Sequence, residues 1–331
     1  MKLSVVTIGR NAGEGLRDTA NAVLGQSRLP DEYLVQDGDS SDGSVAALVA
    51  WLGERYLWEN AETLKAEMLK GEGEPQNTQN TQNEVEKRKA KTDDGGENAE
   101  MLKAETLKCK AGDDGGSREA GGRVCLWGRD CEIKICSEED AGIYDALNRG
   151  IARAQGDVIG LLHADDAYAG SNVLELVMQA FEKGAEAVYG DLQYVRYAEG
   201  TMRLVRNWRS GAYDRRQLPW GWMPPHPTLF LRRDVYARAA LPDGRFFDPT
   251  FRCAGDYDFI LRVLPRLQVP PVYIPRVFVR MRTGGISNRN LSSIVQKSRE
   301  DWLAIRRNKI GSLHTLLAKN LRKVGQFRVA I

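Results

Sequence analysis

The 331-residue chain lacks any apolar run of about eighteen residues, so no membrane-spanning helix is expected. It has only three histidines, and its net charge of +2 is too small to indicate a nucleic-acid partner. Residues 1–8 resemble a signal peptide only superficially, because the apolar part is short, β-branched and followed at once by Gly9-Arg10-Asn11. A first strand is expected there instead.

Cysteine is scarce and irregularly spaced. The five residues (Cys109, Cys125, Cys131, Cys136 and Cys253) form no Cys-x-x-Cys pair, and three of them have spacings wrong for the usual zinc patterns. An odd count fits reduced thiols, so a cytoplasmic location is expected. Residues 9–15, Gly-Arg-Asn-Ala-Gly-Glu-Gly, match neither the Walker pattern nor G-x-G-x-x-G.

Apolar runs of strand length alternate with segments of helical periodicity. The expected strands cover residues 2–8, 32–36, 131–136, 158–162, 187–195 and 272–282, the last interrupted by Pro275, and the expected helices cover 15–26, 44–56, 143–154, 172–183 and 256–267. This alternation predicts an α/β fold with a mostly parallel, Rossmann-like nucleotide-binding sheet and helices on both of its faces. Residues 201–241 are rich in Trp, Arg and Pro and are expected to be irregular.

Residues 59–130 interrupt this pattern with a low-complexity segment. Residues 59–123 contain no Ile, Phe, Tyr, Trp or His, and the decapeptides 61–70 and 99–108 are near-copies. Such a composition cannot bury enough apolar surface to offset its ordering entropy. We expect a mostly disordered insertion within a main domain covering 1–287.

The tail, residues 288–331, is basic, with ten Lys or Arg against two acidic residues. A helical pattern sets leucines (Leu313, Leu316, Leu317, Leu321) against cations (Lys319, Arg322, Lys323). Two interpretations stay open. The tail lies on an anionic membrane surface at the inner face of the plasma membrane, or it packs against the domain with a solvated outer face.

Acidic clusters follow three of the expected strands. They are residues 37–42, residues 138–140, and the pair Asp165-Asp166. Because ligands of parallel α/β sheets bind beyond the carboxyl ends of the strands, these clusters should meet at one edge. Two adjacent carboxylates without a basic neighbour favour a divalent cation, Mg²⁺ or Mn²⁺, that carries a nucleotide diphosphate. A solvated Asp-Asp turn is the simpler alternative.

Four segments, taken in order, resemble the family 2 glycosyltransferases with the GT-A fold, of the colanic-acid and exopolysaccharide type. The segments are 4–11 with Gly15-Leu16 and Gln26; 36–44; 137–148 continuing to Asp165-Asp166; and 226–236 followed by 255–259. The resemblance covers about 1–56 and 131–287. It implies an inverting hexosyltransferase of bacterial polysaccharide or glycan biosynthesis, with a UDP- or GDP-sugar donor and a glycan or lipid-linked acceptor.

The resemblance also assigns residues to roles. It implies nucleotide contacts for Thr7, Asn11, Asp37, Asp39, Asp140, Asn148, Arg149 and Asp165, metal ligation by Asp165 and Asp166, and acceptor or diphosphate contacts for His226, Asp258 and Arg282. Asp256 matches the family's catalytic base, although Gly255 stands where relatives often carry Glu. Asp258 is the rival base, with helix capping as its alternative. His163 replaces a frequent Asn and is expected to fill space.

Two other functions remain open from the sequence. A sugar nucleotidyltransferase also uses an α/β sheet, a metal and a sugar nucleotide, but it usually carries a Gly-rich phosphate loop that is missing here. A catalytically inactive nucleotide-sugar scaffold would act through the insertion and the tail. The presence of Asp165, Asp166 and Asp256 favours the active enzyme.

Overall fold

The computed structural model describes residues 1–56, 123–127, 131–198, 200–283 and 291–326. Most of the predicted insertion therefore lies outside the described residues. One part of it does not: strand β3 (Arg123–Trp127) pairs antiparallel with β4 (Glu132–Ser137). The insertion was thus predicted too long at its C-terminal end, because these residues extend the sheet.

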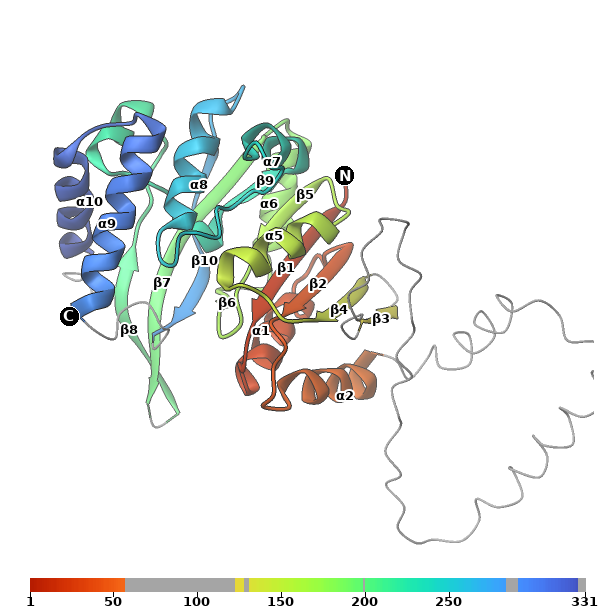
Figure 1. Ribbon diagram of the computed structural model, residues 1–331. Coiled ribbons are helices and arrows are strands. Elements are labelled where there is room, and N and C mark those ends of the chain that lie inside the picture. The colour runs from red at the N-terminus through yellow and green to blue at the C-terminus, as the bar shows by residue number, and fades with distance from the viewer. Residues whose placement is uncertain (57–122, 128–130, 199, 284–290, 327–331) are drawn as a thin grey trace, which may run out of the picture.

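One ten-stranded sheet runs through the molecule in the order β3-β4-β2-β1-β5-β9-β7-β10-β6, with β8 paired to β7 (Figure 1). The remaining strands are β1 (Leu3–Gly9), β2 (Glu32–Asp37), β5 (Val158–Leu161), β6 (Ala167–Tyr168), β7 (Ala187–Ala198), β8 (Thr201–Trp208), β9 (Phe230–Arg232) and β10 (Val272–Arg282). Strands β4, β2, β1 and β5 are parallel, and β10 is parallel to β7. Antiparallel β9 joins these two parallel groups, so the predicted mostly parallel sheet is confirmed.

Helices cover both faces of the sheet. Strand β1 shows why: Leu3 and Val5 belong to one buried cluster, whereas Val6 and Ile8 belong to the other, since successive side chains of a strand point to opposite faces. Helices α1 (Glu14–Leu24), α2 (Ser44–Tyr56) and α6 (Val173–Glu182) contribute to the first cluster, and α5 (Ile143–Arg153), α7 (Arg233–Ala239) and α8 (Gly255–Val263) to the second.

The prediction that residues 201–241 are irregular was wrong. It forms β8, the 3₁₀ helices η1 (Arg215–Trp220) and η2 (His226–Thr228), β9 and α7. Pro275 does not end β10, whose pairing with β7 instead shifts register between Tyr273 and Val277, because a proline cannot donate to the ladder. Helix α8 stops at Val263, and a 3₁₀ turn, η3 (Leu264–Arg266), follows with Pro265 inside it.

The tail forms helices α9 (Leu291–Asn308) and α10 (Leu313–Gly325). Helix α9 packs against α8, and α10 packs against α9 and η1 (Figure 1). Lys319 was expected on the outer face, but it is buried: its Nζ lies 2.6 Å from Asp301 Oδ1 and 3.3 Å from the centroid of the Tyr257 ring. The described residues include no helix long and apolar enough to cross a bilayer.

Candidate active site

Loops after neighbouring parallel strands meet at the carboxyl edge of the sheet. The Asn11 backbone N–H donates to Ser40 Oγ at 2.7 Å, and the Ser41 N–H donates to Asn11 Oδ1 at 3.0 Å. The loop after β4 joins them, since a Cβ on Gly38 would lie only 2.5 Å from Asp140 Oδ2. The fold thus brings Asn11 and Asp140 into one cluster of loops.

Asp37 organises this cluster from within. Its buried carboxylate accepts hydrogen bonds from the Ser40 N–H (2.8 Å), the Ser40 hydroxyl (2.5 Å) and the Ser137 hydroxyl (2.7 Å). Asp39 is exposed and has a φ of 58°. Asp39 is therefore accessible from solvent, whereas Asp37 is already engaged by hydroxyl and amide donors.

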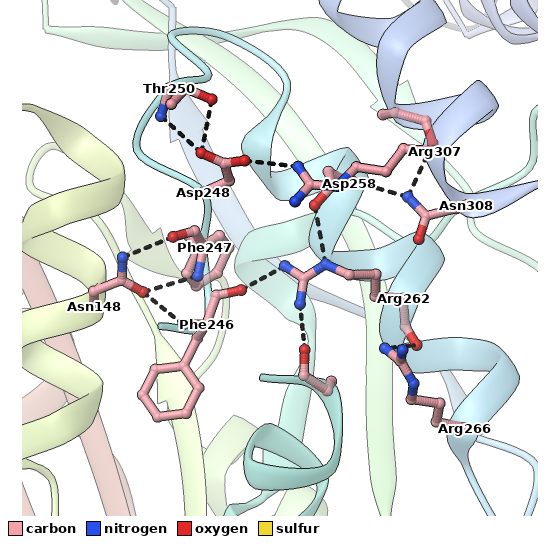
Figure 2. A network of polar contacts seen from close by, with 12 residues as sticks. Asn148, Phe246, Phe247, Asp248, Thr250, Asp258, Arg262, Arg266, Arg307 and Asn308 are labelled. Atoms are coloured by element: carbon pink, nitrogen blue, oxygen red, sulfur yellow. Dashed lines mark hydrogen bonds and ion pairs between the residues drawn. The ribbon is translucent and has the colours of Figure 1, made fainter. Parts of the chain in front are cut away.

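Two of the predicted nucleotide contacts, Thr7 and Asn148, have partners within the protein. The fully buried Thr7 hydroxyl accepts from the Tyr33 hydroxyl at 3.2 Å, so its side chain faces the core. Asn148 is buried: its Nδ2 donates to the Phe247 carbonyl, and its Oδ1 accepts from the N–H groups of Phe246 and Phe247 at 2.8–3.0 Å (Figure 2). Most of the Asn148 amide is therefore used in holding this backbone, and its role at the diphosphate stays a prediction.

Arg149, in the middle of α5, lies among carboxylates. Its guanidinium is 2.8 Å from Asp145 and 3.3 Å from Glu138. Burial raises the pKa of nearby Asp140, and Asp145 adds to that effect, while Arg10 and Arg149 oppose it. Arg149 thus offsets the negative charge of this loop, and a diphosphate would have to compete for it with two carboxylates.

Asp165 and Asp166 follow β5 as predicted and differ in environment. Asp165 is exposed with a φ of 75°, whereas Asp166 is buried and its Oδ2 has no hydrogen-bond partner among the described residues. Burial raises the pKa of Asp166 well above its usual range; the Arg282 backbone N–H opposes this, and Asp165 adds to it. This crowding of like charge is the condition that a cation relieves.

Arg282, at the end of β10, lies beside Asp165. Its guanidinium lies 3.7 Å from Asp165 and 3.1 Å from Asp18, and it stacks over the Tyr197 ring at 5.0 Å. Because the side chain is half exposed, it can also reach a phosphate beside Asp165. The structure therefore brings Arg282 and Asp165 together, although they are far apart in the sequence.

Asp256 lies in the first turn of α8 and is partly exposed. No hydrogen bond or ion pair from the described residues reaches its carboxylate. Tyr194 on β7 links it to the aspartate pair: burial raises the pKa of Tyr194, Arg206 opposes this, and both Asp256 and Asp166 add to it. Both carboxylates thus lie near enough to Tyr194 to disfavour its ionised form.

Two of the three histidines stack beside Asp256. The rings of His163 and His226 are 5.4 Å apart at 27°, and His226 meets Phe247 edge-on. Burial lowers the pKa of both rings, that of His163 to about 3, and Asp256 opposes this in each case. Both rings are therefore neutral, and His163 Nδ1 and His226 Nε2 have no partner within the described residues.

Asp258 does not belong to this site, so its acceptor or diphosphate role is wrong. Its fully buried carboxylate is 3.0 Å from Arg262 Nε and accepts from Asn308 Nδ2 at 2.9 Å (Figure 2). Arg262 in turn donates to the carbonyl oxygens of Ala239 and Phe246. Asp258 therefore stabilises the packing of α8, and only Asp256 is left for chemistry in this turn.

The donor set fits a metal ion in part. No group of three or more His, Cys, Asp or Glu side chains in the described segments is arranged to hold one. The orphaned Oδ2 of Asp166 and the adjacent Asp165 nevertheless offer two hard oxygen ligands, and Mg²⁺-type ions commonly complete their shell with water and substrate phosphates. Cys131 and Cys253 are free thiols outside this set.

Two members of the site were missed from the sequence. Tyr194 sits within an ordinary strand pattern, and only the folded sheet brings it near both Asp166 and Asp256. His163 was expected merely to fill space, yet it stacks on His226. A sequence signal existed for His163, since it lies two residues before Asp165 in a chain with few histidines.

Comparison of the sequence with known proteins finds similar glycosyltransferases. Residues 117–239 match the family model for glycosyl transferase family 2. An uncharacterised glycosyltransferase of Mycobacterium tuberculosis is 31% identical over 189 residues, which cover 55% of this chain and 66% of the relative. The chain spans 56–66% of the length of the curated relatives compared.

Solved structures share the fold at low sequence identity. A mannosyltransferase from Pyrobaculum calidifontis, in complex with GDP-Man and Mn²⁺, gives a TM-score of 0.53 at 11% identity and covers 99% of this chain and 72% of its own. TarS 1-349 of S. aureus in complex with UDP-GlcNAc gives 0.52 at 11% identity, with 96% and 69% covered. The GT-A fold expected from the sequence is thus confirmed, and residues 117–239 of the chain match a family 2 glycosyltransferase domain.

Proposed function

We propose that the chain transfers a hexose from a UDP- or GDP-sugar to a hydroxyl of a glycan or lipid-linked acceptor, with inversion at the anomeric carbon. The observation that carries this proposal is that Asp256 and Asp166, from distant parts of the chain, both lie near Tyr194. Among the described residues, Asp256 is partly exposed and has no partner for its carboxylate, and Asp166 is buried with an orphaned oxygen. Neighbouring structures with bound GDP-Man or UDP-GlcNAc support the donor class.

Asp256 acts as the general base. It takes the proton of the acceptor hydroxyl while the hydroxyl oxygen attacks the anomeric carbon. The bond between that carbon and the phosphate oxygen breaks on the opposite side, so the nucleoside diphosphate leaves with the bonding electrons. The Asp256 carboxylate has no partner among the residues that the structure describes, which leaves it available to a substrate hydroxyl.

Charge on the leaving diphosphate is stabilised near Asp165, Asp166 and Arg282. A divalent cation held by Asp165 and Asp166 would supply electrostatic stabilisation of the departing diphosphate. Arg282 adds a guanidinium that already reaches Asp165 at 3.7 Å. Asn11, Asp39 and Asp140, whose loops meet at the carboxyl edge, contact the nucleoside, while Asp37 holds their loop in shape.

The neutral histidines are suited to recognise sugar hydroxyls. His226 Nε2 and His163 Nδ1 are buried polar atoms that have no protein partner within the described segments. A buried donor or acceptor without a partner costs about 1–3 kcal/mol, and a ligand hydroxyl would remove that cost. We assign His226 to contact with the acceptor or the transferred sugar.

The outer surface of α10 suits a lipid-linked acceptor. Leu313, Leu317 and Leu321 are 58%, 58% and 70% exposed at successive helical turns, and exposed Trp220 lies beside them, its ring 5.4 Å from that of His314. Both acidic residues of the tail, Glu300 and Asp301, are engaged inside the protein. The outward side is therefore basic and apolar, as expected for contact with an anionic membrane surface.

The test is release of nucleoside diphosphate from a panel of UDP- and GDP-sugars in the presence of Mn²⁺, with and without membrane extract. Release of UDP or GDP that depends on the extract would support transfer to a membrane acceptor. Formation of pyrophosphate from a nucleoside triphosphate and a sugar phosphate would indicate a nucleotidyltransferase. Binding of a nucleotide sugar without turnover would identify an inactive scaffold and contradict the proposal.

A further inference from the structure

Glu300 on α9 holds the loop that leads into α8. Its carboxylate accepts hydrogen bonds from three successive backbone N–H groups, those of Arg252 (3.1 Å), Cys253 (2.7 Å) and Ala254 (3.0 Å). Ala254 occupies the N-cap position of α8, where no side chain makes a capping hydrogen bond. Alanine is a poor N-cap because it has no acceptor, so an acceptor from a different helix fixes this turn.

The remaining neighbours of Asp256 are fixed as well. Gly255 packs on Tyr144 so closely that a Cβ would lie 2.8 Å from the ring. Asp301, which follows Glu300, holds Lys319 over the Tyr257 ring. Helix α9 also reaches Asp258 through Asn308 at 2.9 Å. Residues before and after Asp256 are thus held mainly by α9, while its own carboxylate stays unpaired.

We propose that Glu300 is a positioning residue that aims the Asp256 carboxylate at the acceptor hydroxyl by fixing the backbone of residues 252–254. The inference rests on the proposed function, in which Asp256 is the base. Glu300 lies outside the segment that matches the family model, and outside the part of the sequence that resembles the family. The tail therefore does more than cover the domain, because it completes the geometry of the base.

Replacement of Glu300 by alanine removes the acceptor and leaves three N–H groups without it. A displacement of the base by about 1 Å can cost roughly a hundredfold in rate. We expect Glu300→Ala to lower kcat by about 10- to 100-fold, with donor KM and nucleoside diphosphate affinity unchanged, since Asp165 and Arg282 are untouched. Glu300→Gln keeps one carbonyl oxygen as an acceptor and should restore part of the loss.

Arg299→Gln, an exposed change on the same helix, is the matched control and should retain the wild-type kcat. Hydrogen exchange of a peptide covering 252–254 should be faster in Glu300→Ala than in the control. If Glu300→Ala does not fold, Glu300→Gln is compared with the control instead. A lower kcat together with faster exchange at 252–254 supports the positioning role, and values equal to those of the control contradict it.

Three outcomes would overturn the inference. An active Glu300→Ala enzyme with kcat within about twofold of the wild type contradicts the positioning role alone. A parallel loss of nucleotide affinity shows a general structural role instead. Absence of transfer by the wild-type chain with every donor overturns the proposed function, and the positioning role falls with it.

Discussion

At the scale of single residues, burial and hydrogen bonding separate the side chains that hold the fold from those that can act. Asn148 and Asp258 carry the chemistry of a binding site, yet each is held by protein partners. Asp256 and the oxygen Oδ2 of Asp166 have no such partners in the described segments. This contrast leads to two predictions about the stability of variants at these positions.

Replacing Asn148 with alanine should destabilise the protein without weakening donor binding. The change leaves buried backbone groups of Phe246 and Phe247 unpaired, and each such group costs about 1–3 kcal/mol. Chemical denaturation measures the loss, and titration with UDP or GDP measures the affinity. Asn21→Ala, an exposed change on α1, serves as the control. A large loss of nucleotide affinity in Asn148→Ala at unchanged stability would return this residue to the diphosphate site.

Asp258→Asn should destabilise the protein by about 3–5 kcal/mol, because it leaves the buried Arg262 guanidinium without its counter-charge. Asp256→Asn should leave the free energy of unfolding almost unchanged, because its carboxylate has no partner to lose in the described part of the chain. Urea titration of both variants provides the comparison. Equal stability of the two would show that the Asp258–Arg262 pair does not act as described.

The sequence distinguished these residues only in part. Asp256 and Asp258 stand two positions apart, which places them on different sides of a helix, and the i, i+4 spacing of Asp258 and Arg262 was a visible sign of an ion pair. Asn148 gave no such sign, because its partners Phe246 and Phe247 are 98 and 99 residues away. Long-range backbone contacts of this kind cannot be inferred from local pattern.

At the scale of elements, long periodic segments were predicted well and short ones were not. The helix expected at 44–56 has the same bounds as α2, because its apolar period extends over several turns. Strand β9 has only three residues, too few to show a period, and it gains its place by joining β5 to β7. Buried side chains such as Phe230, rather than local propensity, fix such an element.

Glu32, at the start of β2, should make stability depend on acid pH. Burial acts to raise the pKa of Glu32, but hydrogen bonds from Lys134 (2.7 Å), Ser4 and the Gln155 N–H (2.7 Å) outweigh it and lower the pKa below its ordinary 4.5. A lowered pKa in the folded state stabilises the protein above pH 4.5, and this stabilisation is lost as the pH falls through the folded-state value.

Glu32→Gln should therefore be less stable than the wild type at neutral pH, and the difference should shrink as the pH falls below 4.5. Unfolding midpoints at a series of pH values measure it. Glu54→Gln, an exposed change on α2, should show no such trend. A difference that is constant with pH would contradict the role of this charge.

At the scale of the whole molecule, the tail joins the catalytic helix to the outer surface. Helix α10 buries Lys319 against Tyr257 on one side and exposes three leucines on the other. The sequence showed an amphipathic basic tail but could not tell which side faced inward, because the decisive partner Asp301 lies on another helix. The insertion predicted at 59–130 lies mostly outside the described residues, and its role stays a prediction.

Leu317→Ser with Leu321→Ser should weaken binding to vesicles that contain phosphatidylglycerol. Full burial of a leucine side chain contributes about 1.5–3 kcal/mol, so even partial insertion predicts a loss of roughly tenfold or more. Co-sedimentation measures the bound fraction, which should also fall as NaCl is added. Val269→Ser removes an exposed apolar side chain that is not on the tail and should have no effect. Equal binding to phosphatidylcholine vesicles would contradict the role of the basic residues.

The central claim is that a base and a diphosphate site, brought together from distant parts of the chain, share one sugar nucleotide. The most direct measurement pairs the transfer rate of Asp256→Asn with its affinity for the donor nucleotide. We predict loss of detectable transfer at unchanged affinity, because the amide cannot accept the proton while the diphosphate contacts near Asp165, Asp166 and Arg282 remain. Wild-type transfer by Asp256→Asn would contradict the account.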